Sequence, residues 1–394
     1  MSSSVSREPS RSGRHARRPR GLVAAAAGVA VAVVAGVAVW ASRGGEEPAG
    51  VTAGEPVAVD ASASGEVPPA SAPASAGPSR SVPASPKSTI AATQPVATGG
   101  WIPIDSAAWN AQVAKFKATK ADPPGNAGNL AEFRADCTYS HRKADDPIVF
   151  PGLPGASHMH SFVGNKAVDA GTTADDLMKF TASTCKPAVD HSAYWVPTLY
   201  DAATKKPVEP TGFRVYYRSI RNNSTGIMPM PDGLREIAGD AKKKVPTPRG
   251  AQGQFYCAFY GPGNLDGDSR SDNGNWPICG KPAHLHFTLQ FPDCWDGKHL
   301  DSPNHKEHVA FGTDQGCPAD HPVRIPALTF EITYGVTGSK AGYYLSSDPD
   351  GRSASSMHGD AFLMWDAAAM NQRVRNCIAQ RRTCDNDGYD PFSF

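Results

Sequence analysis

The sequence predicts a mainly β domain, a β-sandwich or jelly roll with a few peripheral helices, preceded by an apolar segment and a disordered linker. Three observations favour this fold class. Short runs that alternate apolar and polar side chains recur through residues 101–394. Loops rich in Gly, Pro, Asn and Asp separate these runs. The regular succession of strand and helix patterns that a parallel sheet needs is missing from the sequence.

The first 41 residues have the pattern of a membrane-targeting segment. Residues 1–20 are rich in arginine, and residues 21–41 form an uncharged apolar run about as long as a bilayer core is thick. This run predicts either a transmembrane anchor or a signal peptide cleaved near Ala41. Because the basic flank stays in the cytoplasm, everything after Arg43 is expected outside the cell, tethered in the first case and secreted in the second.

Composition divides the rest of the chain into a linker and one domain. Residues 42–100 consist mostly of Ala, Ser, Pro, Gly and Val and contain no aromatic residue. Such a segment has too little apolar surface to offset the entropy of ordering, so we expect a disordered linker. Residues 101–394 are then a single extracellular domain. A formal net charge of +1 argues against a nucleic-acid partner.

All eight cysteines lie in the predicted domain. An even number of cysteines outside the membrane indicates disulfides, because thiols oxidise there. No CxxC pair is present, which argues against a structural zinc site. Proximity along the chain favours four pairs, namely Cys137 with Cys185, Cys257 with Cys279, Cys294 with Cys317, and Cys377 with Cys384.

Three helices are predicted at the edges of the β domain. Trp109, Val113 and Phe116 recur at helical spacing after Asp105, which is a candidate N-cap. A second helix is expected to open at Thr172 or Thr173. A third is expected from Asp360, as an N-cap, to about Gln380.

Strand patterns are strongest at 213–220, 281–291 and 327–334. Each alternates apolar with polar residues, as a half-buried strand does. In the second run, His284 and His286 fall on the polar face, opposite Leu285 and Phe287.

Paired histidines are the main candidates for chemistry. His158 and His160, like His284 and His286, stand two residues apart, so a strand would turn both rings of a pair to one side. Neutral imidazole binds transition metals, and two such pairs could complete a site for a divalent metal such as Zn, Cu or Ca. The alternative is an ordinary polar strand face.

A second group of candidates lies in the stretch 294–312, which offers Trp295, Asp296, Asp301, His305 and His308. A tryptophan beside carboxylates and imidazoles suits sugar binding, and the same carboxylates could act as acid and base. The alternative makes Asp301 a turn residue and Trp295 part of the core. No GxSxG elbow, P-loop or HExxH helix is present, which argues against the enzyme classes that these motifs mark.

Six motifs in order give the chain a family resemblance: DPIVFPGLPGASHMHSFVGN (146–165), SAYWVPTLYD (192–201), GLREIAGD (233–240), FPDCWDGKHLDSPNHKEHVAF (291–311), CPADHPVRIP (317–326) and MHGDAF (357–362). The chain resembles a family of secreted actinobacterial and fungal proteins known as a domain of unknown function, whose fungal members often carry WSC-type modules regarded as carbohydrate-binding. Fungal relatives tend to lack the HLH pair, so the resemblance gives His284 and His286 less weight.

The resemblance also implies a set of site residues, because these fall on the recurrent motifs: His158, His160, Trp295, Asp296, Asp301, Ser302, His305, His308, His321, Arg324, His358 and Asp360. Of these we expect His158 and His160 to hold a metal or polarise substrate. His305 or His308 would transfer a proton, with Asp296 or Asp301 orienting the imidazole, and His358 and Asp360 would complete the catalytic group. Trp295, Arg324 and His321 would contact substrate.

These residues predict a domain that acts on or binds polysaccharide or cell-envelope glycan through a His/Asp cleft. As an enzyme it would be a lyase or a hydrolase. One alternative is a non-catalytic wall-binding or adhesion module, and another is a surface metal-binding protein without turnover.

Overall fold

The computed structural model describes residues 100–122, 130–220, 224–245, 253–259, 263–264 and 266–388. The predicted basic segment 1–20, the apolar segment 21–41 and nearly all of the linker 42–100 lie outside these residues. Within the described ranges, no helix is long and apolar enough to cross a membrane.

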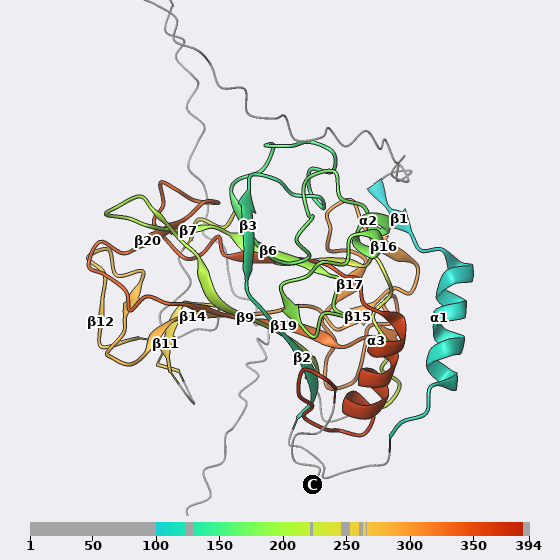
Figure 1. The fold of residues 1–394 in the computed structure, drawn as a ribbon. Helices are drawn as coiled ribbons and strands as arrows, with labels where there is room; N and C mark the ends of the chain where they lie inside the picture. Colours follow the sequence, from blue (N-terminus) through green and yellow to red (C-terminus); the bar gives the residue numbers. More distant parts are fainter. Residues whose placement is uncertain are drawn as a thin grey trace, which may run out of the picture. The chain divides into compact units, whose positions relative to one another are not determined.

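Two antiparallel sheets form the body of the domain (Figure 1). The smaller has five strands in the order β10 (Arg235–Gly239), β21 (His358–Phe362), β6 (Ala193–Pro197), β4 (His160–Gly164) and β3 (Tyr139–Lys143). The larger has six in the order β11 (Tyr256–Ala258), β14 (His284–Gln290), β19 (Ala327–Tyr334), β9 (Pro210–Ser219), β2 (Ala131–Cys137) and β5 (Cys185–Lys186). The predicted mainly β, sandwich-like class is confirmed, and the three strongest strand patterns correspond to β9, β14 and β19.

The core fills the space between the two sheets. Alternate residues of each strand point inward, because successive side chains of a strand alternate between faces. Tyr194 of β6 meets Phe330 of β19 edge to face, with ring centroids 5.5 Å apart. The Tyr194 hydroxyl also forms a 2.5 Å hydrogen bond with that of Tyr217 on β9. The apolar residues of the alternating sequence pattern are therefore those that pack between the two sheets.

The outer faces of the two sheets differ. Loops and helix α2 (Ala174–Lys179) cover the five-stranded sheet with a second apolar cluster that includes Phe162, Trp195 and Phe362. The outer face of the six-stranded sheet instead presents charged and polar side chains, such as Arg214 and Glu331. Polar groups on the covered face of the five-stranded sheet are thus shielded from water. Polar groups on the outer face of the six-stranded sheet are accessible to water.

Short strands form four small sheets of their own. β1 (Ile102–Pro103) pairs with β16 (His299–Asp301), and β12 (Ser269–Arg270) pairs with β13 (Pro277–Ile278). β15 (Cys294–Trp295) lies between β17 (Val309–Ala310) and β18 (Val323–Arg324), while β7 (Leu199–Asp201) lies between β20 (Tyr343–Leu345) and β8 (Pro207–Val208).

The helices confirm two predictions and correct a third. Helix α1 (Ser106–Ala118) begins after Asp105, whose carboxylate accepts hydrogen bonds from two backbone amides. Helix α2 begins after Thr173, which forms a capping box with Asp176. The third helix was wrongly placed: α3 (Ala367–Arg373) begins after Asp366 and continues as the π-helical segment η2 (Val374–Ile378). Asp360 lies in β21, because pairing with β6 and β10 overrides the helical pattern of 360–366.

Four disulfides link the loops to the sheets, and all four predicted pairs are confirmed: Cys137–Cys185, Cys257–Cys279, Cys294–Cys317 and Cys377–Cys384. The first links β2 to β5, and the third links Cys294 of β15 to Cys317, which follows the 294–312 stretch. This density of disulfides suggests an extracellular or secreted protein.

Candidate metal centre

A histidine cluster forms on the covered face of the five-stranded sheet, where two strands flank β6. His160 on β4 lies opposite Pro197 of β6, and Asp360 on β21 lies opposite Trp195. His358 stands two residues before Asp360 and so shares its face. His158 stands two residues before His160, just outside β4. Two i, i+2 pairs from segments 200 residues apart thereby meet across one strand.

The three imidazoles of His158, His160 and His358 are in mutual contact. Ring centroids of His158 and His160 are 4.2 Å apart, those of His158 and His358 5.0 Å, and those of His160 and His358 5.7 Å. One ligand nitrogen from each ring lies within 4.8 Å of the others. The fourth member is Asp360, whose Oδ2 lies 3.8 Å from His358 Nε2.

Backbone carbonyls fix how two of the rings are protonated. Nδ1 of His160 donates to the Asp145 carbonyl at 3.0 Å, and Nδ1 of His358 donates to the Ser356 carbonyl at 2.8 Å. A carbonyl only accepts, so the proton of each neutral ring is on Nδ1 and the lone pair is on Nε2. Metal-binding histidines are held by this kind of outer hydrogen bond.

Several atoms of the cluster have no hydrogen-bond partner in the described part of the protein. They are Nε2 of His158, Nε2 of His160 and Oδ2 of Asp360, all buried. Buried polar atoms are almost always paired, since leaving one unpaired costs about 1–3 kcal/mol. Two of these atoms belong to the group of three close imidazoles, and the third lies beside His358, which indicates a site built for a ligand.

Burial also sets the charge of the cluster. It lowers the pKa of His158 to about 3 and that of His358 to about 4, and it lowers the pKa of His160 well below its ordinary value. The rings are therefore neutral at pH 7. Burial, reinforced by the nearby Asp146, raises the pKa of Asp360 well above its usual range. A cation bound here would compensate the charge of the Asp360 carboxylate.

The donor set fits a transition metal. Three neutral imidazoles and one carboxylate are typical ligands of zinc and copper, whereas calcium takes six to eight oxygen ligands. In a tetrahedral zinc site with bonds of about 2.1 Å, ligand atoms are about 3.4 Å apart. The ligand nitrogens of the three histidines, within 4.8 Å of one another, are somewhat further apart than that.

A second polar network lies beside the cluster, around Asp301. Nδ1 of His305 is 3.0 Å from Asp301 Oδ1, and Arg235 donates to Oδ2 of the same carboxylate at 3.4 Å. His305 has a backbone φ of +58°, in the left-handed region that non-glycine residues avoid at a cost of about 1–2 kcal/mol. Its side chain is 23% exposed, so this ring can meet a solvent-borne molecule.

Asp146 and Lys306 join the two groups electrostatically. Asp146 is influenced by the charges of both His305 and Asp301, and it acts in turn on Asp360. Lys306 influences both His358 and Asp360. The His305–Asp301 pair and the histidine cluster therefore border one region of the protein.

His308 belongs to this region but is fully used in holding it together. Its Nδ1 bonds Ser302 Oγ at 3.0 Å and its Nε2 bonds the Arg235 carbonyl at 2.6 Å. With both ring nitrogens occupied and the side chain buried, His308 is a positioning residue. Of the two histidines expected to transfer a proton, only His305 has the exposure to do so.

The remaining predicted site residues lie elsewhere. Trp295 is fully buried, donates to the His299 carbonyl and meets Trp109 edge to face, so its ring is part of the core and offers no surface to a sugar. Asp296 bonds the backbone and ring of His299 rather than His305 or His308.

The other expected substrate contacts are also engaged within the protein. His321 uses its ring nitrogens on Asp320 and on the Glu307 carbonyl. Arg324 donates to the Thr225 carbonyl. His284 and His286 lie on β14, in the six-stranded sheet, apart from the His158 cluster.

Sequence reasoning missed the residues that support the cluster. Asp145 and Ser356 contribute backbone carbonyls, which no side-chain pattern reveals. Asp146, Arg235 and Lys306 have charged side chains within the quoted motifs, and only the pairing of distant strands shows their role.

Fold and site together define a disulfide-linked, two-sheet β domain that brings three histidines and an aspartate together on one sheet. Residues 146–365 match the family model described as Domain of unknown function (DUF1996), a match that includes all four cluster residues, and the chain belongs to this family. Comparisons with curated proteins and with solved structures gave no significant match.

Proposed function

We propose that this chain is an extracellular, membrane-tethered protein whose His158, His160, His358 and Asp360 bind a divalent transition metal, and that the bound metal serves the cleavage of polysaccharide. The observation that carries the metal proposal is the convergence of three buried nitrogens, each within 4.8 Å of the others, beside a buried carboxylate. The outer hydrogen bonds from His160 and His358 support it, because they leave both Nε2 atoms free to bind.

Metal chemistry at this site would be assisted by His305. A divalent ion lowers the pKa of a bound water and polarises substrate oxygens. His305, held by Asp301 through Nδ1, would accept or donate a proton through Nε2. The His305–Asp301 pair resembles the base-and-orienter arrangement of general acid–base sites. Hydrolysis or elimination of a glycosidic bond are the reactions that this set of groups suits.

The location and the substrate class rest on other observations. Four disulfides favour an oxidising compartment. The apolar run 21–41 after a basic flank would hold the domain outside the membrane, facing the cell envelope. Envelope polysaccharide is the polymer such a domain would meet first.

Metal content tests the central claim. The full chain, purified without a histidine tag, would be loaded with zinc or copper, dialysed and analysed for bound metal. We expect about one equivalent, lost in the double variant His158→Ala/His160→Ala. The matched control is His284→Ala/His286→Ala, which removes a pair of the same spacing from the other sheet. Wild-type protein that retains no metal, or equal loss in both variants, would overturn the proposal.

Turnover separates enzyme from the alternatives. Release of new chain ends from a panel of polysaccharides, abolished by chelator and by His305→Asn, is the expected result for an enzyme. One equivalent of metal without turnover on any polymer would instead favour the surface metal-binding protein. Folded protein that retains glycan equally well with and without chelator, and never cleaves it, would favour the non-catalytic module. The buried Trp295 ring could not supply stacking in that case.

A further inference from the structure

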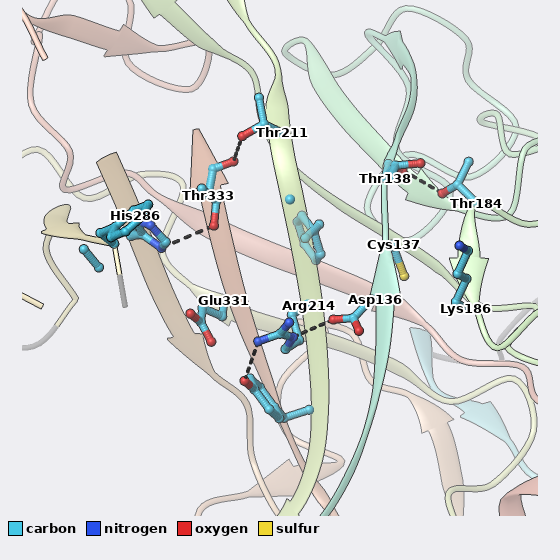
Figure 2. Close-up of a pocket in the computed structure, with 15 residues that line it drawn as sticks. Asp136, Cys137, Thr138, Thr184, Lys186, Thr211, Arg214, His286, Glu331 and Thr333 are labelled. Carbon is cyan, nitrogen blue, oxygen red and sulfur yellow. Dashed lines mark hydrogen bonds and ion pairs between the residues drawn. The ribbon is translucent and has the colours of Figure 1, made fainter. Parts of the chain in front are cut away.

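A groove of about 600 Å³ runs across the outer face of the six-stranded sheet, on the side opposite the histidine cluster. Figure 2 shows side chains from β14, β19, β9, β2 and the β5 region lined up across the strands. Five adjacent strands span on the order of 20 Å, since neighbours are about 4.8 Å apart. The groove is therefore long and open, a shape suited to an extended polymer segment.

The charges in the groove are balanced. Arg214 on β9 has Asp136 as its cross-strand neighbour on one side and Glu331 on the other, and it donates to Asp136 at 2.5 Å. Lys186 adds a second cation to the lining, which then holds two carboxylates and two cationic side chains. An anionic or cationic ligand would find no surplus of the opposite charge here, so the pattern favours an uncharged ligand.

The other lining groups match a ligand rich in hydroxyls. Four threonines, Thr138, Thr184, Thr211 and Thr333, line the groove with His286 (Figure 2). Thr184 and Thr211 donate to backbone carbonyls, and Thr333 Oγ1 bonds His286 Nδ1. The hydroxyl oxygens keep lone pairs that can accept from sugar hydroxyls. Burial lowers the pKa of His286, which keeps that ring neutral.

An aromatic ring lies at the β11 end of the groove. Phe259, directly after β11, lines the groove and is 52% exposed, although burial of a phenylalanine ring would stabilise the fold. Exposed aromatic rings beside hydrogen-bonding groups are typical of binding sites, and the apolar face of a sugar ring can stack on such a ring.

We propose that this groove binds a segment of a neutral polysaccharide, with Phe259 stacking on a sugar ring and Glu331, Arg214 and the threonines bonding its hydroxyls. The substrate class agrees with the proposed function, but the groove lies on the sheet face away from the metal centre. It would therefore hold a polymer chain independently of cleavage, as a second contact that raises the effective concentration of substrate.

Native electrophoresis of the full chain in gels containing a soluble neutral glycan tests this inference. The probes are β-1,3-glucan, a cellulose ether and an α-glucan, with polygalacturonate as the charged comparison. We expect at least one neutral glycan to retard the protein, and Phe259→Ala and Glu331→Gln each to weaken retardation about tenfold. The matched controls, Phe311→Ala and Asp314→Asn, remove an exposed ring and an exposed carboxylate outside the groove and should change nothing.

Two further results separate this inference from the metal proposal. Retardation should persist in chelator and in His158→Ala/His160→Ala, since neither touches the groove. Absence of retardation by every neutral glycan, preference for polygalacturonate, or equal effects of the groove and control substitutions would overturn the groove proposal and leave the metal proposal standing. Wild-type protein that binds no metal yet is retarded by a neutral glycan would overturn the metal proposal and leave the groove proposal standing.

Discussion

His358 Nε2 lies 3.8 Å from Asp360 Oδ2, and both side chains are almost completely buried on β21. Burial and Asp146 raise the pKa of this aspartate more strongly than Lys306 lowers it, and its nearest cluster neighbours are neutral imidazoles. In the proposed holoprotein the bound metal supplies a positive charge beside the carboxylate.

The substitution Asp360→Asn should separate metal binding from folding. Burial raises the pKa of Asp360, so the charged form of this side chain is unfavourable in the metal-free fold. An uncharged amide of the same shape avoids that cost, and the metal-free variant should unfold at the same temperature as metal-free wild type or higher. Its affinity for zinc should fall by about 10- to 100-fold or more. Thermal unfolding with and without zinc measures both effects. A metal-free variant that is markedly less stable would show that Asp360 has a structural role instead.

His305 and His308 should respond differently to substitution. His305→Asn keeps a residue that tolerates the left-handed backbone, so stability should change little while turnover falls by about 10²- to 10⁴-fold. His308→Ala removes two buried hydrogen bonds and leaves a cavity, so the free energy of unfolding should fall by about 2–4 kcal/mol. Metal content should stay unchanged in both. If turnover were lost in His308→Ala but retained in His305→Asn, the assignment of proton transfer to His305 would be wrong.

Asp190 should make the protein less stable as pH rises from about 4 to 7. Burial raises its folded-state pKa to about 7, although Ser192 and Tyr194 donate to the carboxylate. Between the unfolded and folded pKa values, the folded state binds a proton that the unfolded state does not, so stability falls through this window and levels off above it. The total is on the order of 4 kcal/mol. Chemical denaturation of wild type and Asp190→Asn should show a flatter pH profile in the variant, and identical slopes would disprove the assignment.

The disulfides should contribute unequally. Cys137–Cys185 closes a loop with a sequence separation of 48, and Cys377–Cys384 one with a separation of 7. Loop-closure entropy predicts a loss of about 4 kcal/mol on removing the first and about 2 kcal/mol on removing the second. Paired Cys→Ala variants compared by urea denaturation would test the order. A larger loss for the shorter loop would mean that native packing, rather than unfolded-state entropy, dominates.

Much of the fold could be predicted from local sequence. The alternation in β9, β14 and β19, the Asp105 and Thr173 caps, and the nearest-neighbour cysteine pairs are all properties of short segments. The prediction of a helix beginning at Asp360 was wrong for a physical reason. Its segment has a helical pattern of apolar residues, yet β21 is buried on both faces between β6 and β10, and a strand buried on both faces loses its alternation.

The candidate site could be predicted from the sequence only in part. Pairs such as His158 with His160, and His358 with Asp360, are visible as i, i+2 spacing, but their meeting depends on β4 and β21 both pairing with β6. Trp295 shows the opposite case. Its neighbours in sequence suggested a ligand surface, whereas its position on a short strand between β17 and β18 places the ring in the core.

The pairing of β4 with β6 also gives an assay of correct folding. Slipping β4 by one residue would turn His160 toward the inter-sheet core and bring Ser161 to the cluster in its place. A chain with all four disulfides formed but this register wrong would keep its secondary structure and lose the convergence of its imidazoles. The fraction of purified molecules that bind zinc would then measure how many have the five-stranded sheet in its native register.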